Sequence, residues 1–177
     1  MNKQQLLESL RGKGFSEEII EAFSRVKRED FVPKNVRSMA YEDTALPIGK
    51  GQTISQPYTI AVMLSLMDLG KGKKVLEIGS GCGYVLALLS EIVGKNGKAY
   101  GVELVKELVL KSRANLGGYR NISVYNRNGS EGLPEKAPFD SIIISAALRD
   151  IPEKIIGQLK NNGIIVAPKG SRFEQEL

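Results

Sequence analysis

The stretch that decides the fold is Lys-Val-Leu-Glu-Ile-Gly-Ser-Gly-Cys-Gly-Tyr, residues 74–84. Residues 74–78 are rich in β-branched and aliphatic side chains, which is typical of a buried strand. Residues 79–83 then carry three glycines, so the backbone can approach a ligand without Cβ atoms in the way. A helical pattern follows over residues 84–93. A strand, a glycine-rich turn and a helix in this order predict the ligand-binding turn of a βαβ unit.

Strand and helix patterns alternate through the rest of the chain. Strands are predicted over residues 74–78, 99–102, 122–125, 141–144 and 164–166, and helices over residues 84–93, 106–116 and 153–159. Such alternation predicts right-handed βαβ units. The expected fold class is therefore α/β, a doubly wound and mainly parallel sheet with helices on both faces.

The chain before this sheet has a different character. Helical patterns are predicted over residues 4–10 and after an N-cap at Ser16, and residues 41–52 are predicted to form a loop. A third helix is expected to begin at an N-cap provided by Ser55. We therefore divide one compact unit into a helical N-terminal cap with a substrate loop, residues 1–57, and the α/β domain, residues 58–177.

The composition excludes several kinds of chemistry. The 177 residues include no histidine and one cysteine, so no histidine general base, no Ser-His-Asp triad and no cysteine–histidine zinc site can form. We therefore predict no metal site. Any catalysis must use other groups.

Charge and hydropathy limit the partners and the compartment. The net charge is +5, but the lysines are scattered among acidic residues, which indicates a solvated surface and no nucleic-acid partner. No apolar run reaches the roughly 20 residues that a membrane span needs, and the N-terminus does not resemble a signal peptide. The single Cys82 is typical of a reducing compartment, so we expect a cytoplasmic protein without a membrane partner.

The glycine turn and one acidic residue predict the kind of ligand. The dinucleotide fingerprint is G-x-G-x-x-G, whereas this chain has G-x-G-x-G, with Glu77 two residues before the first glycine. That spacing resembles the first loop of S-adenosylmethionine-binding methyltransferases. Glu103 ends the next strand, where an acid can accept hydrogen bonds from both hydroxyls of a ribose. A purely structural turn, and an acid that merely stabilises a helix start, are the simpler alternatives.

A wider resemblance names a family. Residues 46–57, Leu-Pro-Ile-Gly-Lys-Gly-Gln-Thr-Ile-Ser-Gln-Pro, follow Tyr-Glu-Asp at 41–43 and closely resemble the signature loop of protein-L-isoaspartate (D-aspartate) O-methyltransferases. The resemblance continues, in the family's order, at residues 75–84, 134–140, 146–147, 151–152, 158–159, 168–170 and 175–177. It therefore covers almost the whole chain.

The resemblance implies an activity and a set of residues. The activity is transfer of the methyl group of S-adenosyl-L-methionine to the free carboxylate of L-isoaspartyl or D-aspartyl residues in damaged proteins, with S-adenosyl-L-homocysteine as the product. It implies that Ser55 is catalytic, and that Thr53, Ile54 and Ser55 bind the substrate. The cofactor-binding residues that it implies are Thr53, Ser55, Glu77, Gly79, Ser80, Gly81, Gly83, Glu103, Asn128 and Gly129. We also expect the protein to be a monomer.

The absence of histidine agrees with a carboxylate substrate. An isoaspartyl carboxylate has a pKa near ~4, so it is already an anionic nucleophile at neutral pH and needs no base. The donor is a sulfonium cation. The protein then has only to align the reactants and exclude water.

The chain also departs from the family. It has Arg-Asn-Gly at 127–129 where Gly-Asp-Gly is common, Cys82 where a small residue is usual, and Leu-Arg at 148–149 on the peptide-facing rim. Family members continue past the position of Leu177, so we expect their last strands to be missing here. Two alternatives stay open, a cofactor-binding module without catalysis and a methyltransferase for RNA or a small molecule. The loop at residues 52–57 argues against the second.

Overall fold

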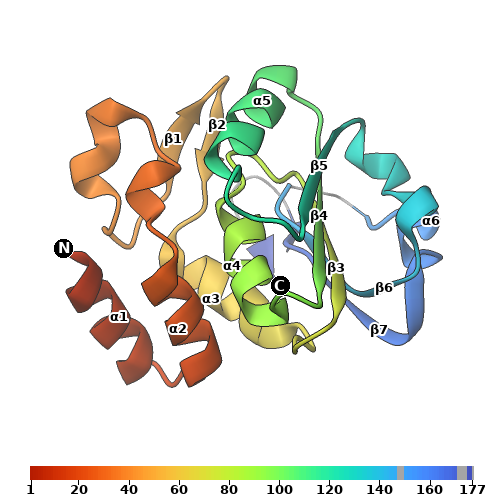
Figure 1. Cartoon of the computed structure of the whole chain (residues 1–177), viewed down its shortest axis with the longest axis horizontal. Coiled ribbons are helices and arrows are strands. Elements are labelled where there is room, and N and C mark those ends of the chain that lie inside the picture. Colours follow the sequence, from red (N-terminus) through yellow and green to blue (C-terminus); the bar gives the residue numbers. More distant parts are fainter. Residues whose placement is uncertain (147–149, 171–174, 177) are drawn as a thin grey trace.

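The computed structural model describes residues 1–146, 150–170 and 175–176 (Figure 1). Leu148 and Arg149, which depart from the family, lie outside the described residues. The centre is a sheet of five parallel strands in the order β5-β4-β3-β6-β7. The strands are β3 (Lys74–Ile78), β4 (Lys98–Glu103), β5 (Ile122–Asn126), β6 (Phe139–Ile144) and β7 (Leu159–Val166). The predicted α/β fold with a parallel sheet is confirmed.

The connections between these strands locate the ligand site. Helix α4 (Tyr84–Val93) links β3 to β4, and α5 (Lys106–Asn115) links β4 to β5. The chain then returns past β3 to β6 through two short 3₁₀ helices, η3 (Gly129–Glu131) and η4 (Pro134–Lys136). The strand order therefore reverses at β3. In such sheets ligands bind beyond the carboxyl ends of the strands at this reversal.

Each face of the sheet is covered by a separate apolar core. Neighbouring residues of a strand point to opposite faces. Val75 accordingly packs in the core that contains the N-terminal helices and α4, whereas Leu76 packs with Phe139 and Ile155 on the other face. All four side chains are fully buried. The sheet is thus the middle layer of three.

The N-terminal helices share the first core. They are α1 (Lys3–Gly12), α2 (Glu17–Arg25), η1 (Arg28–Asp30), η2 (Lys34–Met39) and α3 (Pro57–Leu66). Asn2 caps α1 in a capping box with Gln5. Ser16 stands at the predicted N-cap position of α2, but its side chain makes no capping hydrogen bond. Figure 1 shows α1 and α2 at the end of the molecule away from β7. The division at residues 57 and 58 stays a prediction.

The loop predicted over residues 41–52 is present only in its first half, and the prediction is wrong from Leu46 onward. Its second half forms an antiparallel hairpin of β1 (Leu46–Gly49) and β2 (Gln52–Ile54), which lies beside α5 in Figure 1. The two turn residues are Lys50 with φ 55° and Gly51 with φ 70°. Positive φ at both central positions matches the right-handed twist of the flanking strands. The prediction treated Gly51 only as a chain breaker.

Two helix boundaries were also predicted wrongly. Helix α6 (Glu153–Ile156) is shorter than the predicted helix over residues 153–159, because it ends at Gly157. Leu159 belongs to β7, where it pairs with Phe139 of β6. The N-cap of α3 is Gln56 rather than Ser55, so Pro57 is the first helical residue. A small antiparallel pair, β8 (Lys169–Gly170) with β9 (Gln175–Glu176), completes the described elements. No helix in the described part is long and apolar enough to cross a membrane.

Candidate active site

Two adjoining cavities lie beyond the carboxyl ends of β3, β4 and β6. The larger has a volume of about 300 Å³ and the smaller about 40 Å³. Five residues border both: Ile48, Thr53, Gly79, Gly81 and Ser145. The larger cavity is also lined by Gln52, Ile78, Val102, Glu103, Leu104, Val105, Asn128, Gly129, Ser130 and Ala146. The smaller is also lined by Ile54, Ser55, Glu77, Ser80, Cys82, Tyr84 and Val85.

The glycine turn needs glycine for two reasons. Gly79 has φ 81° and Gly83 has φ 88°, conformations that other residues rarely adopt. A Cβ atom on Gly83 would also lie 2.5 Å from Oγ of Ser112 in α5. Gly83 therefore lets α5 pack against the start of α4. Gly83 does not line either of the two cavities. Gly79 and Gly81, by contrast, border both.

The carboxylate of Glu103 accepts hydrogen bonds from two backbone N–H groups of residues that line the larger cavity. Its Oε2 accepts a hydrogen bond of 2.8 Å from the N–H of Gly81, and its Oε1 accepts one of 2.9 Å from the N–H of Val105. The side chain is only 7% exposed. Each carboxylate oxygen has further lone pairs for a ligand. Glu103 thus joins the glycine turn to the end of β4 and still presents an acceptor to the cavity.

Glu77 is a buried acid with one unsatisfied oxygen. The hydroxyl of Ser145 donates a hydrogen bond of 2.7 Å to its Oε1, while its Oε2 has no partner within the described residues. Burial raises the pKa of Glu77 to about 8, and the hydrogen bond from Ser145 opposes this rise. The unpaired oxygen belongs to a residue that borders the smaller cavity. It can exchange a proton or a hydrogen bond with a ligand there.

The loop after β5 closes the far side of the larger cavity. Asn128 is the N-cap of η3, and its Oδ1 accepts a hydrogen bond of 3.0 Å from the N–H of Ser130. Gly129 packs so closely on Ile78 that a Cβ atom would lie 2.5 Å from its Cγ2. The amide oxygen that sequence reasoning assigned to a ligand therefore already has one local partner.

The hairpin supplies the remaining wall. Thr53, Ile54 and Ser55 all border the smaller cavity, and Thr53 also borders the larger one. Ser55 takes part in hydrogen bonds only through its carbonyl, and its hydroxyl bonds no residue that the structure describes. Gln56, not Ser55, is the N-cap of α3. The ammonium of Lys111 in α5 donates to the carbonyl of Ile48 at 3.3 Å. The hairpin is thereby fixed above the turn.

Sequence reasoning missed several lining residues. Ser145 directly follows β6, so the rule that ligands bind beyond strand ends could have found it. Ile48 and Gln52 carried no such signal, because the hairpin itself was not predicted.

Burial raises the pKa of Cys82 to about 11, so its thiol stays protonated at neutral pH.

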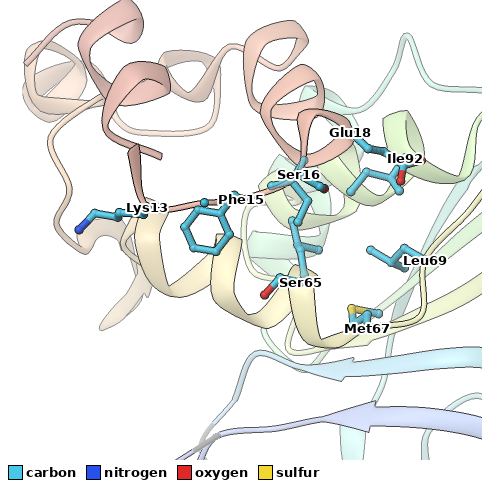
Figure 2. Close-up of a pocket in the computed structure, with 11 residues that line it drawn as sticks. Lys13, Phe15, Ser16, Glu18, Ser65, Met67, Leu69 and Ile92 are labelled. Carbon is cyan, nitrogen blue, oxygen red and sulfur yellow. The ribbon is translucent and has the colours of Figure 1, made fainter. Parts of the chain in front are cut away.

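A further hollow of about 450 Å³ lies elsewhere, between the α1–α2 turn and the ends of α3 and α4 (Figure 2). It is lined by Phe15, Met67, Leu69 and Ile92, with Ser16 and Ser65 also at its wall. No residue of the glycine turn borders it.

Within the described residues no group of three or more histidine, cysteine or acidic residues could hold a metal.

Comparison with protein families gives one match over the whole chain. The model of the family described as protein-L-isoaspartate(D-aspartate) O-methyltransferase matches residues 1–177. A protein-L-isoaspartate O-methyltransferase of Methanothrix thermoacetophila is 50% identical over 179 residues, which cover 100% of this chain and 84% of the relative. One of Ignicoccus hospitalis is 45% identical over 170 residues, covering 94% of this chain and 81% of the relative.

Solved structures agree with the sequence matches. A structure titled protein-L-isoaspartate O-methyltransferase superimposes with a TM-score of 0.90 at 32% identity, covering 95% of this chain and 55% of that one. A beta-aspartate methyltransferase of Plasmodium falciparum, solved in complex with S-adenosyl-L-homocysteine, gives a TM-score of 0.86 at 26% identity. That match covers 99% of this chain and 87% of the other.

Proposed function

The chain belongs to the protein-L-isoaspartate(D-aspartate) O-methyltransferase family, and from this premise we propose how its own residues carry out the reaction. The chain is an S-adenosylmethionine-dependent methyltransferase that acts on L-isoaspartyl residues of damaged proteins and peptides. The residue assignment rests on one observation: the two cavities share the residues Gly79 and Gly81 of the glycine turn. Ser55 and Glu77 line the smaller cavity, and Glu103 lines the larger one.

The residues present fit the methyl donor. In this proposal Glu103 accepts hydrogen bonds from the ribose hydroxyls, and Asn128 with Gly129 borders the adenine. The turn of Gly79, Ser80 and Gly81 follows the methionine part. The unpaired Oε2 of Glu77 supports this assignment, because a buried carboxyl without a partner is costly unless a ligand completes its hydrogen bonding.

The acceptor side belongs to the hairpin and the start of α3. When bound, S-adenosylmethionine would supply a methyl group on a positively charged sulfur. An oxygen–carbon bond to the substrate carboxylate would form as the carbon–sulfur bond breaks, which gives a methyl ester and neutral S-adenosylhomocysteine. We assign to Ser55 the orientation of this carboxylate, because the residue lines the smaller cavity and its hydroxyl makes no hydrogen bond within the described residues. Thr53 and Ile54 complete the wall and exclude water.

No residue has to remove a proton from this substrate. The carboxylate is anionic at neutral pH, so alignment of two bound reactants is the main task of the protein. This agrees with a site that offers hydroxyls, backbone and two acids but no histidine. An amine or hydroxyl acceptor would more often require a base.

The deciding experiment is transfer of a tritiated methyl group from S-adenosylmethionine to two peptides that differ only at one residue, isoaspartyl in one and aspartyl in the other. We expect label in the isoaspartyl peptide alone. Label in neither peptide, with S-adenosylhomocysteine still bound in calorimetry, would favour a binding module without catalysis. Label in RNA or a small molecule alone would favour the other specificity.

The finer assignments concern partners and place. We propose that the enzyme works as a monomer in the cytoplasm, with neither nucleic acid nor a membrane as a partner. The mixed surface charges and the single, buried Cys82 support this. Light scattering after size exclusion measures the mass directly, and a dimer would contradict the proposal.

A further inference from the structure

Arg28 is a charged residue in the apolar core. It begins η1 and is 0% exposed. Among the residues that the structure describes it makes no salt bridge, and its Nε has no hydrogen-bond partner. A buried charge without a counter-ion is unfavourable for folding. The contacts that the guanidinium does make therefore indicate why an arginine stands here.

All the hydrogen bonds of the guanidinium are with backbone carbonyls of residues 42–55, the segment that contains the β1–β2 hairpin. Nη1 donates to the carbonyl of Glu42 at 3.4 Å, and Nη2 donates to the carbonyls of Thr44 at 3.2 Å and Ser55 at 3.0 Å. Glu42 and Thr44 precede the hairpin, whereas Ser55 directly follows it. One guanidinium thus ties together the two ends of the segment that forms the hairpin.

The same group also contacts the start of α4. Its central carbon lies 5.7 Å from the ring centroid of Tyr84, a buried residue that follows the glycine turn and borders the smaller cavity. Tyr84 in turn packs edge-to-face on Phe31, with ring centroids 5.4 Å apart. The guanidinium therefore contacts two parts of the proposed site. One is the segment of residues 42–55, which we assign to the methyl acceptor, and the other is the start of α4, which follows the glycine turn.

We propose that Arg28 is a positioning residue for methyl transfer, which sets the place of Ser55 through the carbonyl oxygen of Ser55 itself. This inference rests on the proposed role of Ser55. The planar fork of an arginine can satisfy several carbonyls at fixed angles, which the single ammonium of a lysine cannot do. Because a shift of about 1 Å in a positioning group can reduce turnover about 100-fold, loosening Ser55 should affect turnover more than cofactor binding.

The test compares Arg28→Lys and Arg28→Met with a control variant at another arginine that bonds a backbone carbonyl. In Arg113→Met the lost arginine is exposed and donates its Nε and Nη2 to the carbonyl of Val124, at 3.1 and 2.6 Å, and neither residue lines the two cavities. We expect Arg28→Lys to lower kcat on the isoaspartyl peptide at least ~10-fold. Its Kd for S-adenosylhomocysteine should stay within about twofold of the parent value. Arg113→Met should change neither kcat nor this Kd by more than about twofold.

A double-mutant cycle separates positioning from general destabilisation. If Arg28 acts through Ser55, adding Arg28→Lys to Ser55→Ala should lower kcat by less than about twofold further. An equal loss in both backgrounds would overturn the proposal, as would normal kcat in a folded Arg28→Lys. Failure of both Arg28 variants to fold would assign the residue to stability and overturn it too. An inactive parent enzyme would instead overturn the proposed function.

Discussion

The hydroxyl of Ser145 donates a hydrogen bond of 2.7 Å to Oε1 of Glu77, across the neighbouring strands β6 and β3. The two residues are 68 positions apart in the chain. Glu77 is 1% exposed, and its other oxygen is unpaired within the described residues. Both residues border the smaller cavity, and Ser145 also borders the larger one.

The buried carboxyl predicts a pH dependence of stability. Burial raises the pKa of Glu77 to about 8, above its ordinary value of 4.5. Between these values the folded chain holds a proton that the unfolded chain has lost, so stability should fall as pH rises through this range. One proton gives a slope of at most about 1.4 kcal/mol per pH unit. Denaturant unfolding from pH 5 to 9 should show this fall relative to Glu77→Gln. Parallel curves for the two proteins would contradict it.

Ser55→Ala should separate catalysis from folding. Because Ser55 is not the N-cap of α3, its loss should change the free energy of unfolding by less than about 1 kcal/mol. Loss of a hydrogen bond to a charged substrate should lower kcat/KM roughly 10- to 100-fold. Ser65→Ala, at the other end of the same helix, is the control and should keep normal turnover. Normal turnover in Ser55→Ala would remove Ser55 from the mechanism.

Glu103→Ala should weaken both the cofactor and the fold. The ribose would lose its acceptor at a cost of roughly 1–3 kcal/mol, and the N–H groups of Gly81 and Val105 would lose theirs. Glu103→Gln keeps one oxygen and should lie between the parent and Glu103→Ala in both measurements. Calorimetry with S-adenosylhomocysteine and thermal unfolding measure the two effects. Unchanged affinity would mean that the ribose binds elsewhere.

Asn128→Asp should tighten cofactor binding by a modest factor. A charged oxygen accepts a stronger hydrogen bond from the adenine amino group than an amide oxygen does. Aspartate and asparagine are about equally good N-caps, so the bond to Ser130 and the stability should be kept. The change in affinity for S-adenosylhomocysteine then reports the ligand alone. Weaker binding would place the adenine with another residue.

The chain contains three Asn-Gly pairs, which form isoaspartate when the glycine nitrogen attacks the asparagine side chain. Asn162 has φ 64° and is exposed, at the irregular part of β7, so we expect damage there first. The nitrogen of Gly97, after Asn96, is held in a hydrogen bond of 3.0 Å to Gly94, so damage there should be slower. Mass spectrometry of aged protein should show this order.

The third pair reports on the cofactor. Asn128 lines the larger cavity, so a bound ligand should restrain it and the following Gly129. Samples aged with S-adenosylhomocysteine should carry less isoaspartate at Asn128 than samples aged without it, while Asn162 should age equally in both. Equal damage at Asn128 in both would argue that the cofactor does not bind there.

Local pattern located all five strands of the central sheet, although β6 and β7 begin earlier in the chain than predicted. Residues 74–78 and 84–93 were predicted with the bounds that the structure has, because a buried strand and an apolar helix impose their own periods on the sequence. The hairpin at residues 46–54 was not found. Its strands are short and its turn depends on positive φ at Lys50, a residue that seldom adopts it.

By itself the sequence determined the order of strands and helices in the central α/β sheet, the glycine turn, and the absence of histidine chemistry, because each is a matter of residue type and local spacing. Only the tertiary structure decided that Ser145 bonds Glu77 and that Arg28 holds the carbonyl of Ser55, 27 positions away. It also decided that Ser55 is not an N-cap. The physical reason is that such bonds join segments brought together by packing of the whole core, and no local period in the sequence records which segments will meet.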